Sequence, residues 1–302
     1  MNSAKDQITF TGNPLDRASD ARINPQWIAE RLGADKSVFL PLYRGDPLVR
    51  DGRAVFLSSA ARGEFPPQAP VVFLGLRNDA AHFAVDLSDA PSPQDAPFAD
   101  FGAWTPLREA AFLLPADDIA IIGEARWFLD WHRRHRFCAV CGSATTLKDG
   151  GSKRQCEACG AEHFPRSDPV AIVLATHEDA CLLGRGPHFP PGFLSALAGF
   201  VEACETPEEC AVRELREEAG VILTNVRYQF SQPWPFPSSL MMGFIADTKD
   251  RALTLDVKEI VEARWVDRRT IEHLLDGEKR EDLKLPPRFT IARRLVERWA
   301  GR

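Results

Sequence analysis

The chain lacks a long apolar segment and an excess of positive charge. Its longest apolar run, PVAIVLA at 169–175, is far shorter than the roughly 20 residues that a membrane-spanning helix needs. The first residues, MNSAKDQITFTGNPLDR, are polar and contain no hydrophobic signal core. A net charge of −6 argues against a surface built for long nucleic-acid backbones. We therefore expect a soluble, cytoplasmic protein that contacts no membrane.

The pattern of the chain indicates more than one domain. Its 302 residues suffice for two domains of ordinary size, and no internal repeat is visible. Strand-like runs at 54–59, 70–76 and 82–87 are separated by turn residues, and a helical pattern covers about 115–136. Beyond 168, strand-like runs mix with helical ones and end in an amphipathic pattern at 288–300. This order predicts an α/β layer architecture for the carboxy-terminal half.

Seven cysteines in a chain without an export signal suggest metal binding or catalysis before disulfides. Four of them form two CxxC pairs, Cys138 with Cys141 and Cys156 with Cys159, separated by fourteen residues. One CxxC turn offers two thiolates to one ion, and four thiolates complete the tetrahedron of Zn²⁺. We predict a zinc ribbon with one structural ion. Two unrelated pairs or a disulfide are the alternative.

Residues 199–221 predict a capped helix with three carboxylates on one side. A capping box, a proline at the first helical position and a terminal glycine stand at Thr206 with Glu209, Pro207 and Gly220. Inside the helix, Glu214, Glu217 and Glu218 are spaced i, i+3 and i+4, which places them on one face. Such carboxylates repel one another, and clustered oxygens of this kind suit Mg²⁺ or Mn²⁺. An ordinary glutamate-rich surface helix is the alternative.

The whole pattern of this segment is GX5EX7REUXEEXGU, where U is a bulky aliphatic residue, and every position is met from Gly199 to Val221. At typical residue frequencies, chance would produce it in fewer than about one in a million such chains. The chain resembles the Nudix hydrolases, which implies an α/β/α sandwich with a mixed sheet and metal-dependent cleavage of a nucleoside diphosphate linked to another moiety. By this resemblance water activated between metal ions and a glutamate attacks a phosphorus in line.

The same resemblance implies roles for individual residues of the segment. The catalytic set is Glu214, Glu217 and Glu218, with Glu217 as the candidate for proton handling. The same three carboxylates and the backbone carbonyl of Ala198 are the implied metal ligands. Glu205 with Arg213 matches the pair that braces the loop against the helix.

Residues 231–239, SQPWPFPSS, hold two large rings on a stiff, proline-rich segment. Proline removes a backbone donor and fixes its φ, so the segment suits neither a helix interior nor a central strand. Rigid aromatics such as Trp234 and Phe236 bind flat rings at low entropic cost, and the neighbouring amide and hydroxyl groups can bond to ribose or base edges. The alternative is that the rings fill the core beneath the loop.

SQPWPFPxS at this distance from the acidic helix resembles the signature of the NADH pyrophosphatase subfamily of the Nudix hydrolases. The resemblance covers almost the whole chain and is weakest over residues 1–115. It implies a Nudix-like α+β domain at 1–136 that ends in a helix, a zinc ribbon at 137–165 and a catalytic Nudix domain at 166–302. The substrate contacts that it implies are Phe164, Phe200, Gln232, Pro233, Trp234, Pro235, Phe236, Pro237, Ser238, Ser239, Glu259 and Ala292.

By this resemblance Glu259 also joins the metal site, with a surface glutamate as the alternative. Phe164 stands where an aromatic residue, often tyrosine, contacts the nicotinamide end; phenylalanine keeps the stacking face and lacks the hydroxyl. The expected reaction splits NAD(H) into NMN(H) and AMP with Mg²⁺ or Mn²⁺, and bacterial members also remove NAD caps from RNA 5′ ends. The subfamily further implies a homodimer. The alternatives are hydrolysis of another dinucleotide or an ADP-sugar, and a nucleic-acid-binding zinc-ribbon protein with an inactive Nudix domain.

Overall fold

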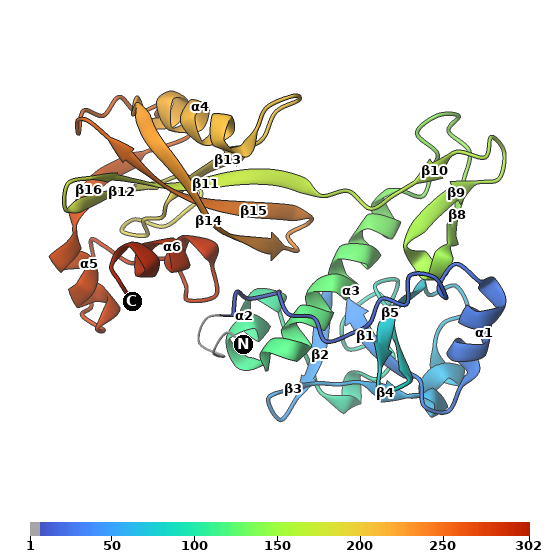
Figure 1. The fold of residues 1–302 in the computed structure, drawn as a ribbon. Helices are drawn as coiled ribbons and strands as arrows, with labels where there is room; N and C mark the ends of the chain where they lie inside the picture. The colour runs from blue at the N-terminus through green and yellow to red at the C-terminus, as the bar shows by residue number, and fades with distance from the viewer. Residues whose placement is uncertain (1–6) are drawn as a thin grey trace. The chain divides into compact units, whose positions relative to one another are not determined.

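The computed structural model describes residues 7–302 and divides into two units (Figure 1). The first comprises the chain up to Arg166 together with Trp234–Ser238, and the second comprises Ser167–Pro233 and Ser239–Arg302. The polar stretch at 1–17, for which no signal core was expected, lies partly outside the described residues. The zinc-ribbon segment 137–165 falls in the first unit, and the bounds of the three predicted domains stay predictions. No helix within residues 7–302 is long and apolar enough to cross a bilayer.

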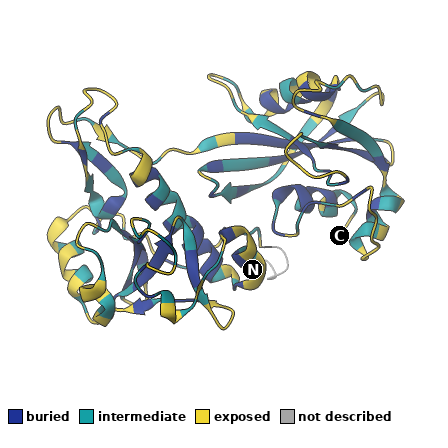
Figure 2. Cartoon of the chain, turned by 180° about the vertical axis from the view of Figure 1, so that it is seen from behind, coloured by how far each residue is buried: buried dark blue, intermediate teal, exposed yellow. Residues whose placement is uncertain are grey.

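The first unit is built on a mixed sheet of seven strands in the order β3-β2-β1-β6-β5, with β4 on β1 and β7 on β2. The strands are β1 (Val38–Tyr43), β2 (Asp46–Arg50), β3 (Arg53–Ala54), β4 (Leu57–Ser58), β5 (Val71–Arg77), β6 (Ala80–Asp86) and β7 (Ala103–Trp104). The helices are α1 (Pro25–Gly33), α2 (Leu107–Leu113) and α3 (Ala116–Arg134), and short 3₁₀ turns lie at Ser59–Glu64 and Ala99–Phe101. The central strands are buried (Figure 2).

The strand predicted at 54–59 is wrong as a single element. Ala54 pairs with Val49 of β2, whereas Leu57 pairs with Phe39 of β1, so the chain changes partner between them. A 3₁₀ turn then begins at Ser59. The runs at 70–76 and 82–87 form β5 and β6, and the helical pattern forms α3.

The ribbon adds a three-stranded sheet, β10-β9-β8, made of β8 (Thr145–Lys148), β9 (Lys153–Cys156) and β10 (Glu162–His163), with a 3₁₀ turn at Asp149–Gly151. A buried histidine of α3 joins the helix to it. His132 Nε2 bonds to the carbonyl of Gly151 at 2.8 Å, and its Nδ1 lies 3.1 Å from Arg154 Nη1. Burial lowers the pKa of His132 to about 4, so the ring is neutral at pH 7 and can accept from the guanidinium.

The second unit has a mixed sheet of six strands in the order β14-β15-β11-β12-β16, with β13 on β11. Its strands are β11 (Asp168–His177), β12 (Ala180–Arg185), β13 (Leu197–Phe200), β14 (Leu223–Trp234), β15 (Ser239–Thr248) and β16 (Glu262–Asp267). Its helices are α4 (Pro207–Ala219), α5 (Arg268–Leu275) and α6 (Ile291–Trp299). β11 runs parallel to β15 and antiparallel to its other partners.

Helices cover both faces of this sheet, with α4 on one side and α5 and α6 on the other (Figure 1). Successive side chains of a strand point to opposite faces. Ala171 and Val173 of β11 accordingly pack in the cluster with α4, while Ile172 and Leu174 pack in the cluster with α5 and α6. The predicted α/β/α sandwich with a mixed sheet is confirmed.

The proline-rich segment spans the end of a strand and the turn that follows it. Ser231–Trp234 finish β14, an edge strand, where a proline can lie without breaking a ladder on both sides. Residues 235–238 form the turn into β15, and the Phe236–Pro237 peptide bond is cis. The three prolines of the segment therefore lie outside any central strand, as predicted, and Ser239 is the first residue of the central strand β15.

Gln232 bonds two backbone groups that precede and begin α6. Its side chain is fully buried; Nε2 donates to the carbonyl of Phe289 at 2.8 Å, and Oε1 accepts from the amide of Ile291 at 2.7 Å. The side chain thus fixes the start of α6 against the end of β14. Its predicted role as a substrate contact stays a prediction.

Removing this amide should destabilise the protein. Gln232→Ala should lower the free energy of unfolding by about 2–6 kcal/mol, because two buried backbone groups each lose a partner at roughly 1–3 kcal/mol. Urea unfolding followed by circular dichroism measures this change. Gln229→Ala is the control, because within the described part of the chain that side chain bonds only to the carbonyl of Arg227 on its own strand. It should change the free energy by less than about 0.5 kcal/mol. Equal effects of both variants would contradict the structural role.

Candidate active site

The acidic helix is capped at both ends as predicted. Thr206 Oγ1 accepts from the amide of Glu209 at 3.2 Å, and the Glu209 carboxylate accepts from the amide of Thr206 at 2.8 Å. Pro207 occupies the first turn, and Gly220 ends the helix at φ 71°. These local signals set the bounds of α4 and therefore the direction of its acidic side chains.

Gly199 lies directly against the carboxylate of Glu214. A Cβ at this position would overlap the Glu214 carboxyl group, so the glycine is required for space. The neighbouring Ala198 pairs with Ile172 in the β11–β13 ladder. The last strand before the loop and Glu214 of the helix are thus packed in contact.

Arg213 joins the loop to the helix. Its Nε and Nη2 bond to the two carboxylate oxygens of Glu205 at 2.7 and 2.8 Å, and Nη2 also donates to the carbonyl of Phe200 at 3.0 Å. Its Nη1 donates to Glu214 at 2.8 Å and to Glu217 at 3.1 Å. The guanidinium lowers the pKa of Glu205 to about 2. The structure therefore has the contacts expected of the predicted brace.

Glu218 is the buried carboxylate of the site. It is 7% exposed, and its Oε2 has no hydrogen-bond partner among the described residues. Burial raises its pKa to about 8, and the charges of Glu214, Glu259 and Glu217 add to the rise. The pKa of Glu214 is also raised, first by burial. A buried anion beside other anions is unfavourable unless a cation joins it.

The other predicted carboxylate ligands are more exposed than Glu218. The Glu217 side chain is 52% exposed, and Glu259 lies on an exposed turn yet its charge acts on both Glu214 and Glu218. Within residues 7–302, no three of these carboxylates bring their oxygens within 4.8 Å of one another. The donor set of hard oxygens fits Mg²⁺ or Mn²⁺, with the unpartnered oxygen of Glu218 as its innermost member.

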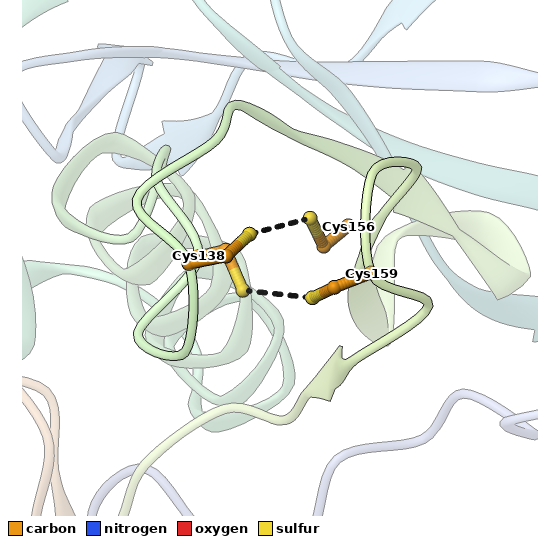
Figure 3. A group of neighbouring side chains, drawn as sticks. Cys138, Cys156 and Cys159 are labelled. Atoms are coloured by element: carbon orange, nitrogen blue, oxygen red, sulfur yellow. Dashed lines mark hydrogen bonds between the residues drawn. The ribbon is translucent and has the colours of Figure 1, made fainter.

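Four sulfur atoms converge in the ribbon (Figure 3). The Sγ atoms of Cys138, Cys141, Cys156 and Cys159 all lie within 4.8 Å of one another, and the pairs 138–159 and 141–156 are 3.7 and 3.5 Å apart. A tetrahedral Zn²⁺ with bonds of about 2.3 Å needs S···S separations of about 3.8 Å. The cluster therefore fits one zinc ion without rearrangement.

The two cysteine turns have the same backbone geometry. The amide of Gly142 bonds to the carbonyl of Cys138, and the amide of Gly160 bonds to that of Cys156, both at 2.9 Å. Both glycines have a positive φ, 77° and 75°, and the space where a Cβ would lie is open at each. Glycine is required at both positions because the backbone is left-handed there. Each turn directs two sulfur atoms to the centre of the four-cysteine cluster.

The two rings of the proline-rich turn are half-buried in the first unit. Their centroids are 4.9 Å apart, and the buried ring of Phe10 meets Trp234 at 6.3 Å and Phe236 at 6.0 Å, edge to face in both cases. The alternative that these rings pack against the protein thus has direct support. Phe10 lies 224 residues before Trp234, and no pattern in the sequence predicts the contact between them.

The remaining predicted substrate contacts differ in exposure. Phe164 and Phe200 are 64% and 61% exposed, which leaves their rings accessible. Ala292 is buried in the first turn of α6, and Ser239 is buried at the start of β15. In the turn and beside it, Pro237 is exposed, Pro233 and Ser238 are half-buried, and Pro235 is buried. Their contacts with substrate stay predictions.

Family models match the chain in three successive segments. The NADH pyrophosphatase-like rudimentary NUDIX domain matches residues 36–131, the NADH pyrophosphatase zinc ribbon domain matches residues 133–164, and the NUDIX domain matches residues 165–289. The order agrees with the sheet of the first unit, the cysteine ribbon and the α/β/α sandwich of the second unit.

Curated relatives match over most of their length. The human protein named NAD-capped RNA hydrolase NUDT12 is 40% identical over 335 aligned positions, covering 96% of this chain and 72% of that protein. NAD-capped RNA hydrolase NudC of Stutzerimonas stutzeri is 39% identical over 218 positions, covering 72% of this chain and 74% of that protein. With its intact acidic box, its four-cysteine ribbon and these relatives, the chain belongs to the NADH pyrophosphatase and NAD-capped RNA hydrolase subfamily of the Nudix hydrolases.

Proposed function

We propose that this protein is a metal-dependent diphosphatase that splits NAD(H) into NMN(H) and AMP and removes NAD caps from RNA 5′ ends. The observation that carries the proposal is Glu218, a buried carboxylate with an unpartnered oxygen inside a complete Nudix box. An inactive Nudix domain would have no need to keep this unfavourable arrangement of charge. The relatives named as NAD-capped RNA hydrolases support the choice of substrate.

The glutamates of the site have different proposed roles. Glu214, Glu217, Glu218 and Glu259, with the carbonyl of Ala198, would hold divalent cations. When bound, Mg²⁺ or Mn²⁺ activates water and neutralises charge on the departing phosphate. Glu217 is the proposed proton acceptor, because its carboxylate is the more exposed of the helix set and one of its oxygens is already oriented by Arg213. Glu205 and Arg213 keep the loop against the helix.

Substrate choice is assigned to the aromatic rings. Trp234 at the end of β14 and Phe236 on the turn, with the exposed rings of Phe164 and Phe200, offer stacking faces for adenine or nicotinamide. The half-buried Ser238 would bond to a ribose or a base edge. The ribbon is proposed to bind zinc structurally, because four cysteines leave no open position for substrate. We also propose that the protein forms a homodimer and is located in the cytoplasm.

The reaction itself tests the proposal. Purified protein is incubated with NADH and Mg²⁺ or Mn²⁺, and the products are separated by chromatography. We expect NMNH and AMP in equal amounts and none in EDTA. Cleavage of an ADP-sugar without cleavage of NADH would replace the proposed substrate, and no cleavage of any dinucleotide would reject the enzyme.

The ribbon should hold one zinc per chain. Cys156→Ser should lose the ion and lower solubility, while the turnover of the remaining soluble protein changes little, because the cysteines and the glutamates belong to different units. Cys204→Ser is the control, since Cys204 is exposed and outside the cluster. Metal analysis by mass spectrometry gives the stoichiometry, and wild-type protein purified without zinc would contradict the assignment.

Trp234→Ala should reduce selectivity for a dinucleotide. Loss of one stacked base removes roughly 1–3 kcal/mol, so kcat/KM for NADH should fall about 5- to 150-fold. Hydrolysis of a small nucleoside diphosphate by the same variant is the internal control and should change little. An equal loss on both substrates would mean that the ring serves only the packing of the first unit.

Glu218→Gln should abolish turnover and leave the fold intact. The amide keeps the shape and helix propensity of the glutamate, and it replaces a buried carboxyl group whose ionisation is unfavourable without metal, so the free energy of unfolding in EDTA should hold or rise. Turnover should fall on the order of 10³-fold or more, about 4 kcal/mol of barrier, while KM for NADH changes far less. Steady-state kinetics and urea unfolding measure both effects. An unfolded variant, or one that keeps a tenth of the turnover, would overturn the assignment.

A further inference from the structure

Arg126 of α3 holds the backbone of the proline-rich turn. Its Nε donates to the carbonyl of Pro235 at 2.8 Å, and its Nη1 donates to the carbonyl of Gly45 at 2.8 Å and to Asp46 Oδ1 at 3.1 Å. Its guanidinium carbon lies 5.0 Å from the centroid of Phe236. A planar guanidinium with several donors in use has one orientation, so Arg126 ties the turn to the β1–β2 connection of the same unit.

The β1–β2 connection is shaped to accept this side chain. Gly45 has φ +82°, and a Cβ there would lie 2.7 Å from Nη1 of Arg126. Asp46 Oδ1 accepts from Arg126 and also from the amide of Leu107, at 3.0 Å. One carboxylate oxygen thus bonds both to the arginine and to the first residue of α2.

Arg108, the next residue of α2, lies over both rings. Its guanidinium carbon lies 4.2 Å from the centroid of Phe236 and 5.1 Å from that of Trp234. Across residues 7–302 no carboxylate lies within ion-pair distance of it. Burial lowers its pKa, with a further contribution from Arg126. The rings are therefore the partners that the structure gives this cation.

We propose that Arg126 and Arg108 are positioning residues that hold Trp234 and Phe236 in one conformation, and that the Nudix-like domain thereby sets the preference for dinucleotide substrates. The proposal rests on the proposed function for the link from ring position to substrate. Rings that are already ordered bind a flat partner without a further ordering cost. If the two rings are less ordered, KM should rise for substrates whose bases stack on them, and the rate of the chemical step should stay unchanged.

Kinetics of four variants test the proposal. Arg126→Met should raise KM for NADH about 10-fold, the scale of ordering two side chains, with kcat within about 2-fold and a small nucleoside diphosphate unaffected. Arg126→Lys should recover part of the loss, because it keeps the charge and one donor. Arg134→Met is the control, since this exposed arginine lies on the same helix and, among residues 7–302, forms an ion pair with Asp130 alone. Arg108→Met should raise KM for NADH in the same way, and it replaces Arg126→Met in the test if that variant folds poorly.

A second readout is independent of activity. In protein labelled with 5-fluorotryptophan, the Trp234 resonance is identified by its loss in Trp234→Phe. It should shift or broaden in Arg126→Met and Arg108→Met and stay unchanged in Arg134→Met. An unchanged resonance, or a KM that rises equally for both substrates, would overturn the inference. Failure of the wild type to cleave NADH would reject the proposed function alone, because the fluorine spectra still report whether the arginines order the ring.

Discussion

The guanidinium of Arg213 bonds at once to Glu205, Glu214 and Glu217 and to the carbonyl of Phe200. Without this cation the acidic residues of loop and helix would repel one another. With it, the loop lies against the helix, and Glu205 stays ionised over the whole neutral range. Glu218 makes no bond to Arg213 and keeps an unpartnered oxygen. The charge that the protein leaves unbalanced is therefore the charge that a divalent ion would balance.

Close packing of α4 makes this arrangement possible, and much of it could be predicted from the sequence. Ala211 and Ala219 are fully buried against the sheet, so the helix lies near enough for Glu214 to touch Gly199. The helix, its caps and the shared face of its carboxylates depend on residues within one turn of each other, which spacing alone encodes. The cysteine ribbon was predictable for the same reason, because each CxxC pair is a local turn.

The surroundings of the proline-rich turn could not be predicted in this way. Phe10, Arg108 and Arg126 meet its rings or its backbone from more than a hundred residues away, and nothing near them in the sequence marks them as partners. The same holds for Gln232, whose hydrophilic character suggested a ligand contact although its amide bonds inside the protein. Local patterns indicate which side chains are unusual; the tertiary fold decides whether the partner is substrate or protein.

Arginine side chains anchor three segments of this chain. Arg213 bonds the carbonyl of Phe200 at the end of β13 and the carboxylate of Glu205 in the Nudix loop. Arg126 bonds the carbonyl of Pro235 in the proline-rich turn and the carboxylate of Asp46, and Arg154 of β9 bonds the carbonyl and hydroxyl of Thr145 at the start of β8. A planar guanidinium suits this task because it satisfies several acceptors in fixed directions, which a lysine cannot do. Loops have few backbone bonds of their own, so one such side chain removes much of their freedom. The residues 36–131 match a rudimentary NUDIX domain and contain no acidic box, yet they supply Arg108 and Arg126 around the aromatic rings.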